Sequence, residues 1–303
     1  MAVRLSKQQE ENKPERSIRQ LPLLILLIIA VVFLYESSFM MSSRAFLEGE
    51  KRKPESVAEQ IPLTDSTVII TSSLIPTHPS IRMVNETVNS IREMIGGLAY
   101  NTPILISVDG RKEYNKEDIE RLQKYVENLR MRFLHDPYVT ILNNYQFGHI
   151  SNSIRVALQM VETEFVYVVQ HDFKFIKPIN HTSLVGVMRE HPDQIKMVRF
   201  GKNRFRGDVL DVCDEYNKLD SVKYGIYLVL AQWSDNNHFT TKKHYDRILK
   251  DIGPTPRPVE APMMGHLVLN ATSDCTYLLQ YTYNWMQGPF IGHLDGRLTL
   301  QRK

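Results

Sequence analysis

The stretch from Phe165 to Asp172 reads FVYVVQHD, and it decides the fold that we predict for this chain. Its unbroken apolar run indicates a strand that is buried on both faces, as strands of parallel sheets are. The run ends in Gln170, His171 and Asp172, which places an imidazole and a carboxylate where the strand leaves the sheet. Ligands of open α/β sheets bind at these carboxyl ends. The stretch therefore predicts a polar ligand site at the end of a buried strand.

Segments typical of strands and of helices alternate on both sides of this stretch. Strands are predicted at 67–73, 103–109, 139–142, 165–170 and 195–200, and helices at 80–95, 116–132, 150–161 and 183–190. Such an alternation implies right-handed crossovers and a mostly parallel sheet that is covered on both faces. The predicted fold class is therefore α/β, with a doubly wound, Rossmann-like sheet. Its strand ends add Ser72, Ser73 and Asp109 to the residues expected at the ligand site.

The composition favours a folded domain and gives no support for nucleic-acid binding. The chain has 303 residues, of which 43% are hydrophobic, and its formal net charge is +3. This apolar share can supply a core, and the Lys and Arg residues are spread along the chain rather than gathered in one basic run. The two cysteines, Cys213 and Cys275, leave two readings open: one disulfide in an oxidising compartment, or two buried free thiols.

An uncharged apolar segment near the N-terminus predicts a membrane anchor. Residues 21–35 read LPLLILLIIAVVFLY, and their Leu, Ile, Val and Phe side chains favour membrane insertion by about 4 to 7 kcal/mol in total. The transmembrane helix is predicted over 21–41, because Ser37–Met41 are needed to complete the span. Basic residues are more frequent in 1–20 than directly after the helix, so this tail is expected in the cytosol. A cleaved signal peptide is the alternative.

These features predict a single-pass type II membrane protein of the Golgi or the endoplasmic reticulum. The charged segment 42–65 contains prolines and has no apolar period, so it is expected to form a stem. Residues 66–303 then form the lumenal domain. N-x-S/T sequons at Asn85, Asn180 and Asn270 agree with a lumenal location.

The order of these segments resembles the GT-A glycosyltransferases, in particular those of the family 2 type, over about residues 67–297. The strand end IITSS (69–73) and the helix after it resemble the part of that family that opens the nucleotide pocket, which implies that Ser72 and Ser73 contact the cofactor. The segment ISVDG ends the second strand, and the resemblance implies that its Asp109 contacts the base or the ribose of a nucleotide.

The same family has a DXD metal motif, which falls here on QHD. The preceding helix of the family resembles GHISNSIRVAL (148–158). Gln170 departs from the motif, so the resemblance implies Asp172 as the metal ligand, with Gln170 and His171 in the cofactor pocket. The implied cofactors are a divalent metal, Mn or Mg, and a nucleotide diphosphate sugar.

Later segments resemble the acceptor side of these enzymes. HFTTKKHYDRILKDIG (238–253) is similar to a helix rich in basic and aromatic residues, and the VEAPMM segment after it implies Glu260 as the general base. Asp235 in WSDNNH is the second candidate for that role. In IGHLDGR, His293 is implied as a further metal ligand and Arg297 as a charge partner of the pyrophosphate.

Each of these residues also has a structural explanation. Asp172 would then cap the turn after its strand, and His171 would be a buried histidine with its hydrogen bonds satisfied. Glu260, between two prolines, would be an ordinary loop carboxylate, and His293 would be a surface residue.

The functional prediction is an inverting, metal-dependent glycosyltransferase that moves a sugar from a nucleotide diphosphate sugar to a glycan, protein or lipid acceptor. The alternative is a membrane-tethered glycan-binding or scaffold protein that has kept the fold and lost catalysis, which Gln170 favours. A hydrolase is less well supported, because the sequence contains neither a G-x-S-x-G nor an H-E-x-x-H motif.

Overall fold

The structure is a computed structural model that describes residues 65–113, 115–144, 146–203, 218–231, 233–263 and 280–294. The predicted tail, membrane helix and stem lie outside these ranges except for Asp65, and so do Cys213, Cys275, Asn270 and Arg297. No helix within the described ranges has both the length and the apolar character needed to cross a membrane. The anchor, the stem and the location of the protein therefore stay predictions.

Strands and helices alternate through the first half of the domain, as predicted. This half contains β1 (Ser66–Ser73), α2 (Arg82–Met94), β2 (Ile95–Gly96), β3 (Ile104–Asp109), α3 (Lys116–Arg132), β4 (Val139–Asn143), α4 (His149–Leu158) and β5 (Phe165–Gln170). The second half contains β6 (Phe173–Phe175), β7 (Ile179–Asn180), α5 (His181–Glu190), β8 (Met197–Arg199), β9 (Lys218–Ser221), β10 (Ile226–Ala231), β11 (His238–Thr241), α6 (Lys242–Asp251), β12 (Gln280–Tyr283) and β13 (Ile291–His293).

One sheet of nine strands forms the centre of the domain, in the order β4-β3-β1-β5-β11-β8-β12-β10-β9. The four strands β4, β3, β1 and β5 are parallel to one another, as predicted. The remainder is mixed, because β11 runs antiparallel to β5 and β8, and β10 runs antiparallel to β12 and β9. The expectation of a mostly parallel sheet is therefore right for the first half and wrong for the second.

The strand β11 was not predicted, because its residues were assigned to the helix expected at 238–253. His238–Thr241 reads HFTT, which is rich in aromatic and β-branched residues that favour a strand. The Thr241 hydroxyl then accepts a hydrogen bond from the His244 N–H, so Thr241 caps the helix α6 that follows. The predicted helix is thus a strand and a helix that meet at one capping residue.

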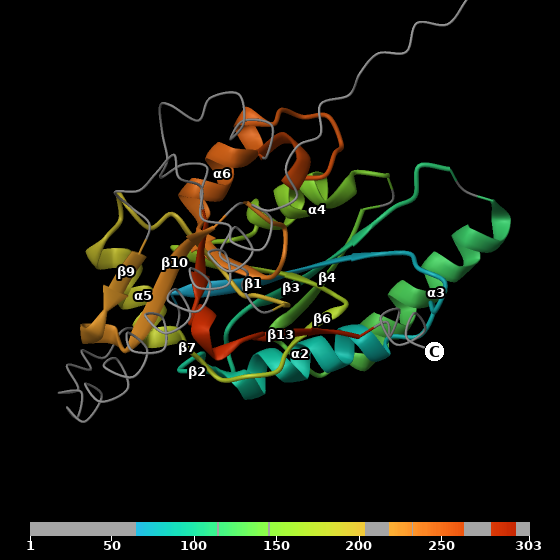
Figure 1. Ribbon diagram of the computed structural model, residues 1–303. Helices are drawn as coiled ribbons and strands as arrows, with labels where there is room; N and C mark the ends of the chain where they lie inside the picture. Colours follow the sequence, from blue (N-terminus) through green and yellow to red (C-terminus); the bar gives the residue numbers. More distant parts are fainter. Residues whose placement is uncertain are drawn as a thin grey trace, which may run out of the picture. The chain divides into compact units, whose positions relative to one another are not determined.

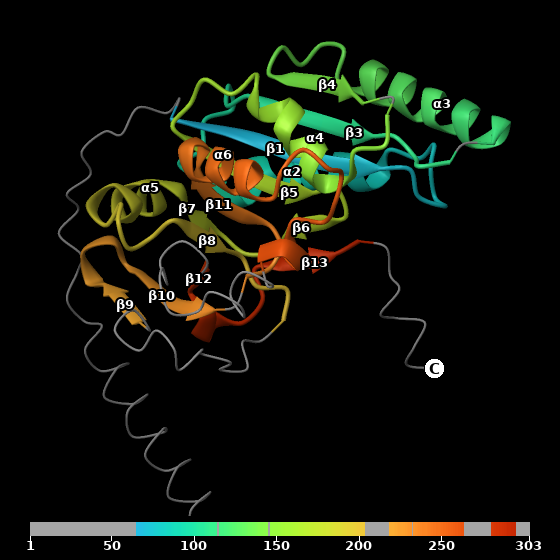
Figure 2. The ribbon, with the colours of Figure 1, turned by 90° about the horizontal axis from the view of Figure 1, so that it is seen from above.

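Helices cover both faces of this sheet. Figure 1 shows α2 and α3 below the strands and α4 and α6 above them, and Figure 2 looks onto the face that carries α4 and α6. The central strands are correspondingly buried: Val68, Ile69 and Ile70 of β1 are fully buried, as is Val169 of β5. This burial on both faces is what the apolar run of β5 predicted.

Two short ladders lie beside the main sheet. In the first, β13 pairs antiparallel with β6, so that Ile291 lies opposite Phe175 and His293 opposite Phe173. In the second, β2 pairs parallel with β7. The first ladder matters for function because it follows directly on the strand end that carries Asp172.

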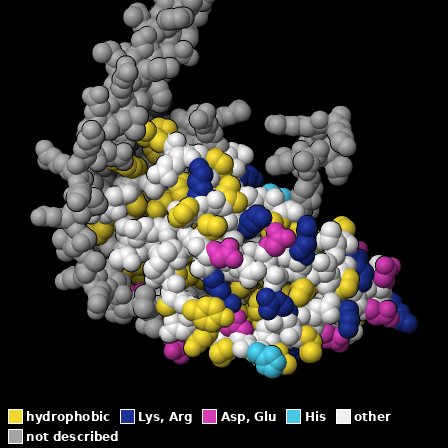
Figure 3. Space-filling view, turned by 90° about the horizontal axis from the view of Figure 1, so that it is seen from below, with side chains coloured by type: hydrophobic (Ala, Val, Ile, Leu, Met, Phe, Trp, Pro, Cys, Tyr) yellow, Lys and Arg dark blue, Asp and Glu magenta, His cyan; other side chains and the backbone are white. Residues whose placement is uncertain are grey.

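The underside of the domain, which includes α2, carries charges of both signs. Figure 3 shows basic and acidic side chains intermixed with apolar ones over this face. Glu86 of α2, for example, is paired with Arg82 at 3.7 Å and with Lys174 at 3.4 Å. The described residues of this face therefore do not form the concentrated basic patch that nucleic-acid phosphates require.

The buried His238 of β11 should make the folded state sensitive to acid. Its ring stacks on Tyr245 with centroids 5.5 Å apart, and its Nδ1 lies 2.7 Å from the Asn236 carbonyl oxygen. Burial lowers the pKa of His238 from 6.5 to about 4. Between about pH 6.5 and about pH 4, His238 is therefore protonated in the unfolded chain but neutral in the folded chain. The free energy of unfolding must fall as the pH drops through this range.

We expect His238 to contribute about 3 kcal/mol to this acid destabilisation. Urea unfolding followed between pH 7 and pH 4.5 should show a shallower loss of stability in His238→Phe than in the wild type. His135 is exposed, and His135→Gln should leave the slope unchanged. Equal slopes in the wild type and in His238→Phe would contradict the assignment.

Candidate active site

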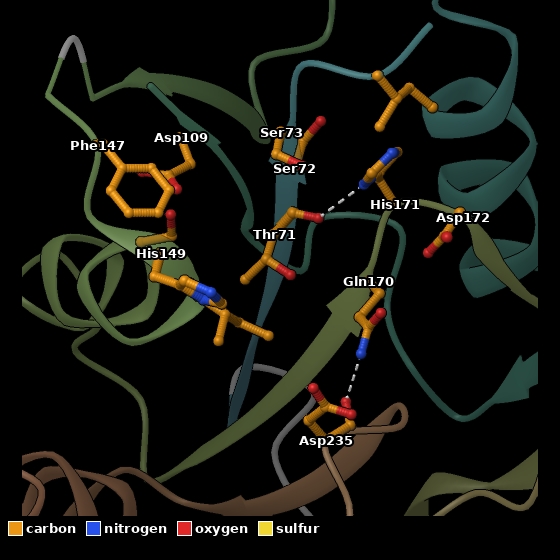
Figure 4. A pocket seen from close by; sticks show the side chains of 13 residues that line it. Thr71, Ser72, Ser73, Asp109, Phe147, His149, Gln170, His171, Asp172 and Asp235 are labelled. Carbon is orange, nitrogen blue, oxygen red and sulfur yellow. Dashed lines mark hydrogen bonds between the residues drawn. The ribbon is translucent and has the colours of Figure 1, made fainter. Parts of the chain in front are cut away.

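A cavity of about 380 Å³ opens at the carboxyl ends of β1, β3 and β5. The strands β3 and β4 follow on one side of β1, and β5 lies on its other side, so the strand order reverses here. Ligands of doubly wound sheets bind at such reversals. Figure 4 shows the side chains that line it. The cavity brings together most of the residues that the sequence singled out, namely Ser72, Ser73, Asp109, Gln170, His171, Asp172 and Asp235.

The two serines at the end of β1 differ in their surroundings. The Ser72 side chain is buried, and its Oγ lies 2.8 Å from the Tyr125 hydroxyl of α3. Ser73 is exposed at the edge of the cavity. Of the two predicted cofactor contacts, Ser73 is therefore the better placed, whereas Ser72 ties β1 to α3.

Asp109 ends β3 and closes one side of the cavity. One of its carboxylate oxygens accepts a hydrogen bond of 2.8 Å from the Gly148 N–H at the start of α4. Burial raises the pKa of Asp109, and the N–H groups of Gly148 and His149 oppose this shift. Asp109 thus caps a helix that has no side-chain cap of its own, and it still lines the cavity.

Phe147 and His149 line the same side of the cavity and were missed in the sequence (Figure 4). Their ring centroids are 5.6 Å apart. Phe147 lies just before the segment GHISNSIRVAL that resembled the family pattern, and His149 is the first residue of the helix α4 in that segment. These two residues could have been predicted, because an aromatic ring and an imidazole stand at the start of a helix that faces the predicted ligand site.

His171 is held by backbone groups on two sides. Its Nδ1 lies 3.3 Å from the Thr71 carbonyl oxygen, as the dashed line in Figure 4 marks, and its own carbonyl accepts a hydrogen bond from the Thr87 hydroxyl of α2. The side chain is only 7% exposed. His171 is therefore largely buried and also lines the cavity, so its predicted contact with the cofactor stays a prediction.

Asp172 and His293 meet although they are far apart in the sequence. The Asp172 Oδ2 lies 3.1 Å from the His293 Nε2, with 19% and 25% of the two side chains exposed. The β13–β6 ladder brings them together, and the Leu294 N–H donates to the Asp172 carbonyl oxygen at 2.8 Å. The His293 ring also packs against the Phe173 ring, with centroids 4.7 Å apart. His293 therefore lies beside Asp172, the residue that the resemblance implied as the metal ligand.

Two further carboxylates belong to the predicted base candidates, Asp235 and Glu260. Burial raises the pKa of Asp235, and the Asp172 charge raises it further, against the opposing charge of Lys202. Burial and then the Asp235 charge raise the pKa of Glu260, which a hydrogen bond with Ser234 and the Lys202 and Arg199 charges oppose. Of the two predicted base candidates, Asp235 lines the cavity and Glu260 does not, and both are more easily protonated than an ordinary carboxyl.

Gln170 lines the cavity, and its side chain also contacts the Asp235 segment. Its side-chain amide donates to the Asp235 backbone carbonyl at 2.8 Å (Figure 4). Its N–H is thus used within the protein, which the sequence could not show because the partner lies 65 residues away. Arg297, the remaining predicted site residue, lies outside the described residues.

The described residues do not include three His, Cys, Asp or Glu side chains grouped closely enough to hold a metal ion by themselves. Asp172 and His293 offer one carboxylate oxygen and one imidazole nitrogen. Such a pair can bind a divalent cation only together with ligands from water or from a substrate.

Among solved structures, the crystal structure of GalNAc-T7 with UDP, GalNAc and Mn²⁺ matches 78% of this chain with a TM-score of 0.51. The chain has a GT-A glycosyltransferase fold. The sequence identity to GalNAc-T7 is 11%, and the GT-A domain described above spans about half of that chain, 45%. The resemblance to GT-A enzymes read from the sequence is thereby confirmed at the level of the fold.

Weaker similarities to this GT-A domain were found in S. aureus TarS. A crystal structure of TarS residues 1–349 matches 77% of this chain and 61% of that chain, with a TM-score of 0.42 and 13% identity. The same fragment in complex with UDP-GlcNAc matches 77% of this chain and 59% of that chain, with a TM-score of 0.43 and 12% identity. No protein-family model matches the sequence. No curated protein matches it either.

Proposed function

We propose that this chain transfers a sugar from a nucleotide diphosphate sugar to a hydroxyl group of a glycan, protein or lipid acceptor, with inversion and with the help of a divalent metal ion. The observation that supports the proposal is the pair of Asp172 and His293, 3.1 Å apart at the end of β5 in a GT-A fold. The pairing places a carboxylate oxygen and an imidazole nitrogen, both partly exposed, beside each other.

The residues present fit a divalent metal ion bound to a diphosphate. Oxygen ligands suit Mn²⁺ and Mg²⁺, and such ions commonly keep waters and phosphate oxygens in their remaining positions. Asp172 and His293 would hold the ion, which supplies positive charge to the departing diphosphate when bound. GalNAc-T7, which shares the fold, was crystallised with UDP and Mn²⁺, so these are the first ligands to test.

Different residues of the chain would then bind the donor and activate the acceptor. Asp109, Ser73, Phe147 and His149 surround the end at which the nucleoside would lie. Glu260 takes the proton of the attacking acceptor hydroxyl, for which its raised pKa suits it, because a general base is most effective when its pKa approaches the working pH.

We also propose that the enzyme is a type II protein of the Golgi or endoplasmic reticulum with a lumenal GT-A domain. This part of the proposal rests on the sequence alone, on the apolar segment 21–41 and the basic residues before it.

Thermal unfolding with nucleotide diphosphates tests the proposal before any acceptor is known. UDP at a hundred times its Kd should stabilise the wild type by about 2.7 kcal/mol, and only in the presence of Mn²⁺ or Mg²⁺. A panel of nucleotide sugars, read by product mass, then identifies the donor. Unchanged unfolding with every nucleotide diphosphate, with and without metal, would instead favour the inactive scaffold.

A further inference from the structure

The segment Ser234–Asn237 carries Asp235 to the cavity, and three carboxamide side chains hold it there. Two of them come from strands of the nine-stranded sheet, Gln170 from β5 and Gln280 from β12, and the third is Asn237 of the segment itself. The three residues do not stand close together in the sequence. We call them the carboxamide frame.

Gln280 holds the beginning of the segment with a paired hydrogen bond. Its Oε1 accepts from the Ser234 N–H at 2.9 Å, and its Nε2 donates to the Ser234 carbonyl oxygen at 2.8 Å. The side chain is fully buried. Both backbone groups of Ser234 are thus fixed by one side chain in a place that water does not reach.

Gln170 and Asn237 hold the middle and the end of the segment. The Gln170 amide donates to the Asp235 carbonyl oxygen at 2.8 Å, and the Gln170 backbone N–H donates to the Asn237 Oδ1 at 3.0 Å. Asn237 is fully buried, donates through Nδ2 to the Phe173 carbonyl at 3.0 Å, and accepts from the Phe200 N–H at 2.8 Å. The segment is therefore tied to the ends of β5, β6 and β8 at once.

This frame holds a carboxylate whose burial is unfavourable. Burial raises the pKa of Asp235, and the Asp172 charge adds a smaller contribution in the same direction. A free loop would relieve the cost of burial by turning Asp235 toward water. Hydrogen bonds to three backbone positions instead keep the loop in place, which is how supporting residues fix a functional side chain.

We propose that Gln170, Asn237 and Gln280 are positioning residues that hold the Asp235 carboxylate at the cavity, where it provides the negative charge that the QHD segment lacks at Gln170. Gln170 then acts through Asp235 and does not itself contact the donor. The role of Asp235 rests on the function proposed above, whereas the frame stands on the hydrogen bonds alone.

Hydrogen exchange of the ligand-free protein tests the frame. In Gln170→Leu, backbone amides of residues 233–237 should exchange about tenfold faster, the effect of losing one hydrogen bond, while amides of β3 keep their wild-type rates. Asn128→Leu is the matched control, because it removes a carboxamide of α3 that donates to the Pro79 carbonyl oxygen at 3.0 Å. Unchanged exchange of residues 233–237 in Gln170→Leu would overturn the frame.

A double-mutant cycle tests whether Gln170 acts through Asp235. We expect Gln170→Leu to weaken UDP binding in the presence of Mn²⁺ by about tenfold, the usual scale for residues that orient a ligand group. In an Asp235→Asn background the same change should cost less than about twofold, because the group that it positions is gone. Effects that multiply would show that Gln170 acts independently of Asp235 and would overturn the proposal.

The two experiments separate the two proposals. A wild-type protein that binds neither UDP nor any other nucleotide diphosphate with Mn²⁺ contradicts the proposed function and the role of Asp235 in it. The exchange measurement still decides whether the carboxamide frame exists. Gln170→Glu adds a second variant of similar shape, which replaces the donating amide by an acceptor and should speed exchange at the same residues.

Discussion

Asp172→Ala is expected to lower kcat/KM for transfer by about a thousandfold or more, the scale on which active sites lose a group that stabilises charge in the transition state. Asp172 is the carboxylate at the end of β5 and is paired with His293 at 3.1 Å. Its loss removes the oxygen donor of the proposed metal site. Initial rates at several Mn²⁺ concentrations, measured with the donor found by the product-mass screen, give the value.

The metal dependence distinguishes this effect from a general loss of structure. In His293→Ala, added Mn²⁺ should recover part of the activity, because one donor remains, whereas in Asp172→Ala it should recover little. Asp246→Asn is a control, since Asp246 is an exposed residue of α6 paired with Lys242. Activity of Asp172→Ala near that of the control would exclude Asp172 from the site.

Glu260→Gln is expected to reduce kcat by about a hundredfold to ten thousandfold, the range for loss of a general base. The substitution keeps the size of the side chain and removes its capacity to accept a proton. UDP binding with Mn²⁺ should stay within about twofold of the wild type, because Glu260 acts on the acceptor and not on the donor. Isothermal titration with UDP and steady-state rates measure the two quantities separately.

Asp235→Asn provides the comparison for Glu260. If Asp235 is held at the cavity to complete the negative charge near Asp172, its replacement should weaken UDP binding as well as turnover. A loss of kcat alone in Asp235→Asn, with Glu260→Gln fully active, would transfer the role of general base to Asp235 and contradict the assignment made here.

The sequence predicted the first half of the fold well because its strands are buried on both faces. Such strands appear as uninterrupted apolar runs, and β1, β3 and β5 lie within a few residues of their predicted positions. Parallel strands also end at one edge of a sheet, so Ser73, Asp109 and Asp172 could be placed together without knowing any distance.

The second half was harder to predict because its pairings connect residues far apart in the chain. Nothing in HFTTKKHY marks the change from β11 to α6 except the capping residue Thr241. The hydrogen bond from Gln170 to Asp235 is equally hidden, because a carboxamide beside an expected metal motif looks like a lost ligand when its partner is unknown. Local sequence patterns determine the helices and strands, whereas the role of a polar side chain depends on hydrogen-bond partners that are far away in the sequence.

The attachment of β13 has a consequence for how the site is completed. It pairs with β6 through three residue pairs and lies outside the nine-stranded sheet, so releasing it would leave the central architecture whole. Short peripheral ladders separate at a lower free energy than a whole domain unfolds. A single local detachment would carry His293 away from Asp172 and leave a folded molecule whose proposed metal site has one donor instead of two, so the attachment of β13 would set the affinity for metal independently of global stability.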